Sequence, residues 1–175
     1  MSVTDRDRNY LLVSAGSKHG STAEIAERIG AVLRDRGNDV DIADPDDVSD
    51  LGRYDAVVLG SAVYAGRWVE SAKQLAERVA GLSPTIPTWL FSSGPIGDPP
   101  KPEEDPVDVA DILQAAGARE HRVFSGKIDK SKLNFAERAI LVAVRAPEGD
   151  FRDWDEIDEW ATDIAETLVK ETSDQ

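Results

Sequence analysis

The sequence of 175 residues contains no cysteine and only two histidines. The lack of cysteine excludes disulfides, thiolate nucleophiles and cysteine-ligated metals, and it fits a reducing compartment. His19 and His121 are too few for a histidine-rich metal site, so we expect no metal centre. Any redox chemistry must then come from a bound organic cofactor, with the protein supplying position, electrostatics and access.

Long apolar runs are also missing, and no stretch is long enough to span a bilayer. The charged residues at 1–8 lack the apolar region of a signal peptide. Basic residues are in the minority, with 20 Lys and Arg against 34 Asp and Glu and a formal net charge of −14. This acidity argues against a nucleic-acid partner. We expect a cytoplasmic protein whose membrane contact is at most peripheral, at the inner face, and the composition leaves its oligomeric state unknown.

Apolar runs alternate with amphipathic stretches along the chain. The pattern predicts strands over residues 9–14, 39–43, 56–60, 88–92 and 120–125. It predicts helices over residues 21–36, 69–80, 107–116 and 153–170. Parallel strands need crossover helices, so we expect an α/β three-layer sandwich with a five-stranded parallel sheet of order 2-1-3-4-5. We expect one domain over 1–175, with an inserted segment over 127–152.

The loop after the first strand is rich in hydroxyl groups and glycine, and reads Ser17-Lys18-His19-Gly20-Ser21-Thr22. Ser21 and Glu24 have capping-box spacing, which predicts a helix that begins at Ser21 or Thr22. Unpaired N–H groups at a helix start, with hydroxyl donors beside them, favour phosphate binding. A capped turn that binds nothing is the alternative. The spacing matches neither a Walker A loop nor the Gly-x-Gly-x-x-Gly dinucleotide fingerprint.

Two further loops should meet the first one at the carboxyl edge of the sheet, where the strand order reverses. The third strand is followed by Ser61-Ala62-Val63-Tyr64-Ala65-Gly66. Tyr64 is a candidate to stack on a planar ring, and Trp68 either stacks as well or packs at the start of the next helix. The fourth strand is followed by Ser92-Ser93-Gly94 and a proline-rich run, which offer small groups for close approach to the backbone.

The first loop resembles the flavodoxin signature, in which Ser/Thr-x-x-Gly-x-Thr precedes x-x-x-Ala. Ser17, Gly20, Thr22 and Ala26 occupy its four positions, while Ala15 stands where an aromatic residue usually precedes the loop. The resemblance implies a flavodoxin-like fold that binds FMN, with the phosphate on the first loop. It implies that the residues at 17–22, 61–66 and 92–94 form the cofactor site, and it assigns no catalytic residue.

Over nearly its whole length, the chain looks like the flavodoxin-domain branch that includes menaquinone-dependent protoporphyrinogen IX dehydrogenases. The likeness covers Gly60-Ser61-Ala62-Val63, an extra segment after the fifth strand, and a closing helix that begins near Asp153-Trp154. It implies an FMN-dependent oxidoreductase that passes electrons from a protoporphyrinogen-like substrate to a quinone. A flavodoxin-type electron carrier that docks on redox partners, or a fold that has lost its flavin, are the alternatives.

The inserted segment is locally basic in an acidic protein and carries an apolar run over 139–144. Arg138 and Arg145 flank that run. We expect a helix that lies beside the open edge of the flavin and guides a hydrophobic acceptor or substrate. The alternative is a helix that simply packs on its own domain.

Overall fold

The computed structural model describes residues 8–64, 66–94, 109–143 and 148–173. Its central sheet is parallel and has the order β2-β1-β3-β5-β6. These strands are β1 (Tyr10–Gly16), β2 (Asp39–Ala43), β3 (Ala56–Tyr64), β5 (Thr88–Ser93) and β6 (Glu120–Phe124). The predicted fold class and strand order are confirmed, because β5 and β6 are the fourth and fifth strands of the prediction.

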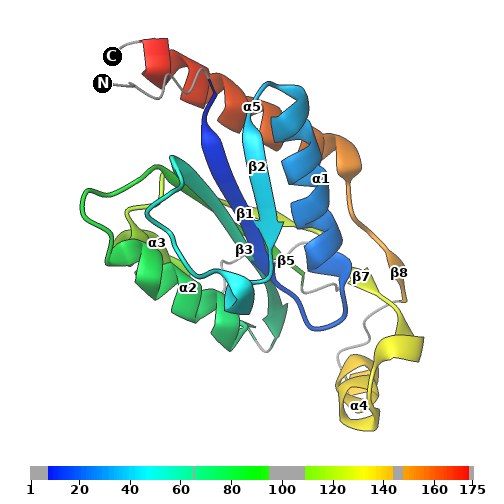
Figure 1. Ribbon diagram of the computed structural model, residues 1–175. Coiled ribbons are helices and arrows are strands. Elements are labelled where there is room, and N and C mark those ends of the chain that lie inside the picture. Colours follow the sequence, from blue (N-terminus) through cyan, green and yellow to red (C-terminus); the bar gives the residue numbers. More distant parts are fainter. Residues whose placement is uncertain (1–7, 65, 95–108, 144–147, 174–175) are drawn as a thin grey trace.

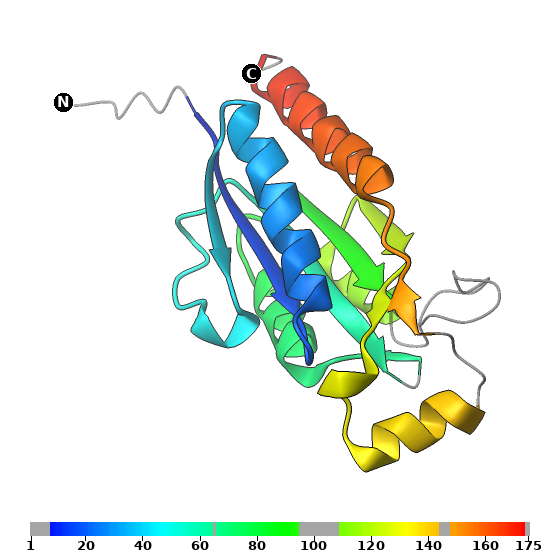
Figure 2. The same cartoon turned by 90° about the vertical axis from the view of Figure 1, so that its right-hand side faces the viewer.

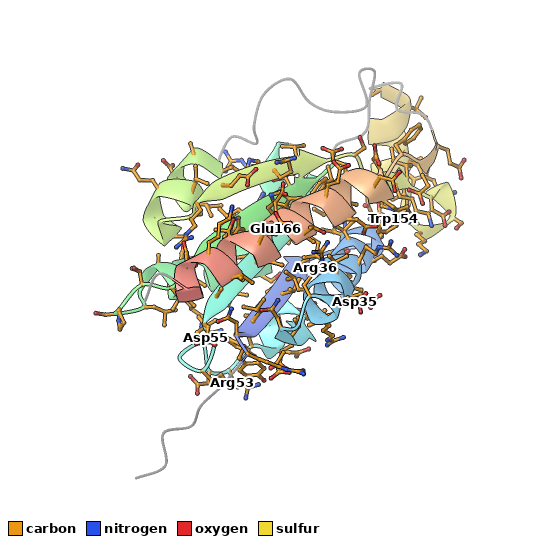
Figure 3. All side chains as sticks on the ribbon, turned by 90° about the horizontal axis from the view of Figure 1, so that it is seen from above. Asp35, Arg36, Arg53, Asp55, Trp154 and Glu166 are labelled. Atoms are coloured by element: carbon orange, nitrogen blue, oxygen red, sulfur yellow. The ribbon has the colours of Figure 1, made fainter. Side chains whose placement is uncertain are left out.

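Helices cover both faces of this sheet (Figure 1). One face is covered by α1 (Ser21–Asp35) and α5 (Trp154–Ser173), which run side by side in Figures 1 and 3. The other face is covered by α2 (Glu70–Ala80) and α3 (Val109–Ala116). None of the helices in the described ranges is both long enough and apolar enough to cross a membrane.

The core between the sheet and α1/α5 is built around three aromatic rings. Trp160 of α5 meets Phe124 and Phe91 edge to face, with ring centroids 5.5 Å and 6.0 Å away. The ring of Phe91 lies on the backbone of β3, where a Cβ on Gly60 would be 2.1 Å from its Cζ atom. Gly60 is therefore required by this close approach. The fully apolar inner face of α5 consists of Ile157, Trp160, Ala161, Ile164, Ala165 and Leu168.

The core beneath α2 brings the end of β1 close to a helix. A Cβ on Gly16 would lie 2.2 Å from Val69 Cγ2 and 2.9 Å from Ala72 Cβ, so only glycine fits there. Trp68 is buried in the same core, with 3% of its surface exposed. The packing alternative for Trp68 is thus the correct one, and it cannot provide a wall for a ring ligand.

The third strand is longer than the sequence predicts. It continues past Gly60 to Tyr64, and β4 (Arg67–Trp68) then folds back antiparallel on it, with Val63 opposite Trp68. The expected loop is therefore largely a hairpin with Gly66 at a φ of 74°. Every residue from Ala56 to Val63 is buried, so the strand stays within the core up to Val63.

The inserted segment forms a separate layer at one end of the sheet. It contains β7 (Lys127–Ile128), a 3-10 turn η2 (Lys130–Lys132), α4 (Phe135–Ala143) and β8 (Gly149–Asp150), which pairs antiparallel with β7. Another 3-10 turn, η1 (Pro45–Asp47), follows β2. Figures 1 and 2 show α4 projecting beyond the end of the sheet to which β1 and β3 point.

Candidate functional site

The loop between β1 and α1 differs in its cap from the sequence-based expectation. Gly20, with a φ of 92°, is the N-cap of α1, and its N–H donates to the Ser17 Oγ atom at 3.0 Å. The capping box predicted for Ser21 and Glu24 is wrong, because Ser21 already lies inside the helix and no side chain caps it. Only glycine adopts this left-handed conformation easily, so the turn at Gly20 determines where the helix starts.

This cap leaves the first turn of α1 suited to an anion. The N–H groups of the first turn have no acceptors within the helix, and they lie at its positive end. A Cβ on Gly20 would meet no atom within 4 Å, so the loop backbone is open at this point. Ser17 and His19 are half-buried, Lys18 is exposed, and Thr22 is buried with 1% exposed. The open backbone and the positive end of the helix therefore suit a phosphate group.

The Glu24 carboxylate is held by Arg152, which lies just after β8. The Arg152 guanidinium donates to Glu24 at 2.9 Å, to the Ser21 carbonyl at 3.2 Å, and to both oxygens of Asp150 at 2.7 and 2.8 Å. Only 4% of the Arg152 side chain is exposed. The bonds to Arg152 lower the pKa of Asp150, and those to Asp150 raise the pKa of Arg152. One end of the insertion is thus fixed to the start of α1.

Glu137, in the first turn of α4, fixes the middle of the insertion to the loop. Its Oε2 atom lies 2.7 Å from His19 Nε2 and 3.3 Å from Lys18 Nζ. Its Oε1 atom faces the backbone N–H of Asn134 at 3.4 Å, and the Glu137 N–H donates to Asn134 Oδ1 at 2.8 Å, which is a capping box. The hydrogen bond with His19 holds the pKa of Glu137 below its usual range.

At the end of β3, the polar side chain of Ser61 is hydrogen-bonded within the protein. The Ser61 hydroxyl donates to the Ala62 carbonyl at 2.7 Å and accepts the Val69 N–H at 2.9 Å. Ser61 is fully buried, and Ala62 and Val63 are each 7% exposed. Tyr64 is the last residue of the strand, and Ala65, which is also among the predicted cofactor-site residues, lies outside the described residues. Ser61, Ala62 and Val63 can therefore meet a ligand mainly through their backbone.

The end of β5 carries a buried polar network that the sequence did not reveal. The Trp68 indole N–H donates to the Ser92 Oγ atom at 2.8 Å, and this oxygen lies 2.7 Å from His121 Nε2 on β6. Since the indole occupies an acceptor position of the hydroxyl, the Ser92 proton is available for His121. The Gly94 N–H donates to the Phe124 carbonyl at 3.0 Å. Ser92 therefore joins β5 to β6 and to the β3–β4 hairpin.

The three predicted loops do come together at one edge of the sheet. Gly16 at the end of β1 is level with Ser61 of β3, and Ala62 is level with Ser93 of β5. Ser93 is 4% exposed, and Gly94 follows it with a φ of 77°. The proline-rich continuation, over 95–102, lies outside the described residues.

Sequence reasoning missed Glu137, Arg152 and the contact between Ser92 and His121. The pattern Asn134-x-x-Glu137 marks the start of α4 and could have singled out Glu137. No local pattern indicates that Arg152 contacts Ser21 and Glu24, because these contacts cross more than 120 residues. The approach of Ser92 to His121 depends on the register of β5 and β6, which the sequence does not determine.

This geometry defines a doubly wound α/β protein in which an open loop and a helix N-terminus lie at the switch point of the sheet. The sequence matches the flavodoxin domain family over residues 12–155, and the chain belongs to this family. Membership in it indicates FMN as the cofactor. The open backbone at Gly20 and the adjoining Lys18 are consistent with a phosphate-bearing flavin.

Solved structures share this fold at low sequence identity. A flavodoxin from the domain Archaea is 20% identical with a TM-score of 0.63, and the match covers 91% of this chain and 98% of that one. A Streptococcus pneumoniae flavodoxin is 20% identical with a TM-score of 0.61, covering 93% and 99%. Rubredoxin oxygen:oxidoreductase from Desulfovibrio gigas is 17% identical with a TM-score of 0.62, but the match covers 93% of this chain and 36% of that one. A search of curated protein sequences finds no significant match.

Proposed function

We propose that this protein is an FMN-dependent oxidoreductase that takes electrons from a protoporphyrinogen-like substrate and passes them to a quinone. The observation that carries the proposal is the open, positively polarised loop of Ser17 to Thr22 at the start of α1. The bound FMN supplies the redox chemistry. We propose that the loop holds its phosphate through backbone N–H groups and the hydroxyls of Ser17, Ser21 and Thr22.

The flavin ring would then lie along the carboxyl edge of the sheet. The β3–β4 hairpin and the end of β5 flank this edge, and their buried serines leave backbone groups as the contacts that orient a ring. The Ser92 hydroxyl is held between Trp68 and His121, so it stiffens this edge and keeps the hairpin close to β5. Tyr64 remains our candidate for stacking on the ring.

The surface of α4 supports a hydrophobic electron acceptor. Phe135 and Val142 are 89% and 74% exposed, and their spacing of seven residues places them on the same side of the helix. Arg138 lies between them in sequence and is also exposed. Exposed apolar and cationic groups beside the anion-binding loop fit a quinone that approaches from the inner face of a membrane. Arg145 lies outside the described residues.

A flavodoxin-type electron carrier is the second candidate. The net charge of −14 favours it, because an acidic surface steers a carrier towards basic redox partners. Turnover separates the two functions. An enzyme oxidises protoporphyrinogen with a quinone as the only other reactant, whereas a carrier needs a second protein to reduce or oxidise it.

The proposal is tested first at the cofactor. Extraction and absorbance spectroscopy of purified protein should yield FMN rather than FAD, because no adenosine site is evident in the sequence. Changing Thr22 to Val removes a hydroxyl and should weaken FMN binding by about 1–3 kcal/mol. Recovery of FAD alone, or unchanged FMN affinity in the Thr22→Val protein, contradicts the assigned phosphate site.

The role of α4 is tested with a double variant, Phe135→Ser with Val142→Ser. Both side chains are exposed, so flavin content and melting temperature should stay unchanged while quinone reduction slows. Val169→Ser is a matched control, because Val169 is 59% exposed on α5 and belongs to another face. Equal quinone reduction by the double variant and the control would exclude α4 from acceptor binding.

A further inference from the structure

Glu137 stands out because a single carboxylate performs two structural tasks. Its Oε1 atom closes the capping box of α4 with Asn134, and its Oε2 atom contacts both His19 and Lys18 of the loop. The Glu137 side chain is 16% exposed, so these contacts are partly shielded from solvent. The start of α4 is thereby joined to residues that immediately precede Gly20 and the open turn.

The two contacts place a negative charge next to a site that suits anions. Lys18 and His19 are the cationic or ionisable side chains within the Ser17–Thr22 segment. Oε2 of Glu137 faces both, so much of their attraction for an anion is already taken up by a carboxylate. A phosphate on the loop has the same sign of charge as Glu137 and draws on the same two partners. The bound phosphate should therefore weaken the contact of Glu137 with the loop, and that contact should weaken the binding of phosphate.

We propose that Glu137 sets the affinity of the loop for the phosphate of its ligand and couples that affinity to the docking of α4. The inference rests on the proposed function in placing the phosphate on the loop. An intact Glu137 contact lowers the affinity for phosphate, and a bound phosphate loosens α4. Because the coupling is reciprocal, both effects have the same size in free energy. A loosened α4 carries Phe135 and Val142 with it, so ligand binding changes the apolar surface offered at this end of the sheet.

The substitution Glu137→Gln separates this electrostatic role from a structural one. Glutamine also satisfies a capping box, so α4 should still form. Its amide nitrogen in place of Oε2 cannot accept hydrogen bonds from His19 or Lys18. Glu159→Gln is the matched control, because Glu159 is exposed on α5 and the change in net charge is identical.

The affinity is measured by titrating each apoprotein with FMN and with riboflavin, which lacks the phosphate. Glu137→Gln should tighten FMN binding about threefold to tenfold at low salt, with a smaller gain at high salt, and leave riboflavin binding unchanged. Glu159→Gln should leave both affinities unchanged. Weaker FMN binding by Glu137→Gln, or no difference from the control, overturns the inference.

The coupling is measured by hydrogen exchange of the α4 amides, with inorganic phosphate as the probe. Phosphate should speed exchange across residues 135–143 in the parent protein. In Glu137→Gln, exchange should already be fast and should not respond to phosphate. If phosphate protects the amides of the loop but leaves α4 exchange unchanged, the inference fails while the phosphate site stands. If phosphate and FMN leave the loop amides unaffected, the proposed phosphate site fails, and the inference with it.

Discussion

The sheet with its covering helices and the insertion at residues 127–152 are held by different kinds of contact. The inner face of α5 is apolar and fully buried against β5 and β6, with Trp160 at its centre. In the described part of the insertion, α4 exposes Phe135 and Val142 and is tied down through the carboxylate of Glu137. The free energy gained by burying apolar area does not depend on a bound anion. The strength of an ion pair beside an anion site does depend on it, because the anion competes for the same positive charge. We therefore expect a bound anion to affect the docking of α4 and to leave the packing of the sheet unchanged.

Removal of a large core ring should have the largest effect. Trp160→Ala deletes a ring that is 1% exposed and contacts both Phe91 and Phe124, so it should lower the free energy of unfolding by about 3–5 kcal/mol. Chemical denaturation measures the change. Trp160→Phe keeps an aromatic ring and should lose less, although it also removes the indole N–H that donates to Glu120 at 3.1 Å. A loss below 1 kcal/mol for Trp160→Ala would contradict the importance of this core.

Addition of one methyl group at Gly60 should have the next largest effect. The new Cβ would overlap the ring of Phe91, so Gly60→Ala should destabilise the protein by about 1–3 kcal/mol. The double variant with Phe91→Leu should be less unstable than the sum of the two single changes, because the smaller side chain makes room. Thermal and urea unfolding of the four proteins measure this coupling. If the losses in unfolding free energy of the two single variants simply add in the double variant, the contact with Phe91 is not what destabilises Gly60→Ala.

Loss of the arginine anchor should act locally. Arg152→Met keeps the apolar part of the side chain but removes its bonds to Asp150, Glu24 and the Ser21 carbonyl. Because Asp150 and Glu24 are partly exposed, we expect a loss of only about 1–2 kcal/mol, seen as faster hydrogen exchange in β7 and β8. The amides of β1 and β3 should keep their protection. A uniform loss of protection across the sheet would mean that the insertion and the core unfold together.

Acidification should have the smallest effect of these changes, and it should affect α4 while leaving the core folded. The pKa of Glu137 is lowered in the folded protein by its hydrogen bond to His19. The ionised carboxylate therefore contributes fully to the docking of α4 above the ordinary carboxyl pKa of about 4.3. That contribution is lost as the pH falls through the lowered value. Protection of α4 amides, corrected for intrinsic exchange, should stay constant from pH 7 to about 5 and then decline. Glu137→Gln should show no such decline while near-ultraviolet circular dichroism still reports a folded core.

The sequence predicts the sheet well because its signals are local. The apolar run at Ala56 and the glycine that ends α1, Gly37 with a φ of 93°, mark a buried strand and a helix terminus. Trp89 and Phe91 alternate onto one face of β5 and are both buried in the α1/α5 core, as their spacing predicts. The extra length of β3 was missed, because Ser61 and Gly60 within the strand resemble a loop in composition.

The site is only partly predictable, since its closing contacts span long stretches of sequence. The Ser17–Thr22 segment is recognisable from its glycine and hydroxyl groups, but the cap at Gly20 was not. Ser21 and Glu24 have the right spacing for a capping box, yet Arg152 supplies a stronger charged partner for Glu24 from the far end of the chain. The pairing of Glu137 with His19 joins residues 118 positions apart. Such contacts depend on how the insertion folds back, which no short pattern records.

The central claim is that the Ser17–Thr22 loop holds the phosphate of FMN. Amide NMR of the apoprotein, titrated in parallel with FMN and riboflavin, tests it most directly. We predict that the amide signals of Gly20, Ser21 and Thr22 shift strongly with FMN and little with riboflavin, because only FMN carries a phosphate to accept their hydrogen bonds. Equal shifts of these three amides with both ligands, or no shift with either, would contradict the account.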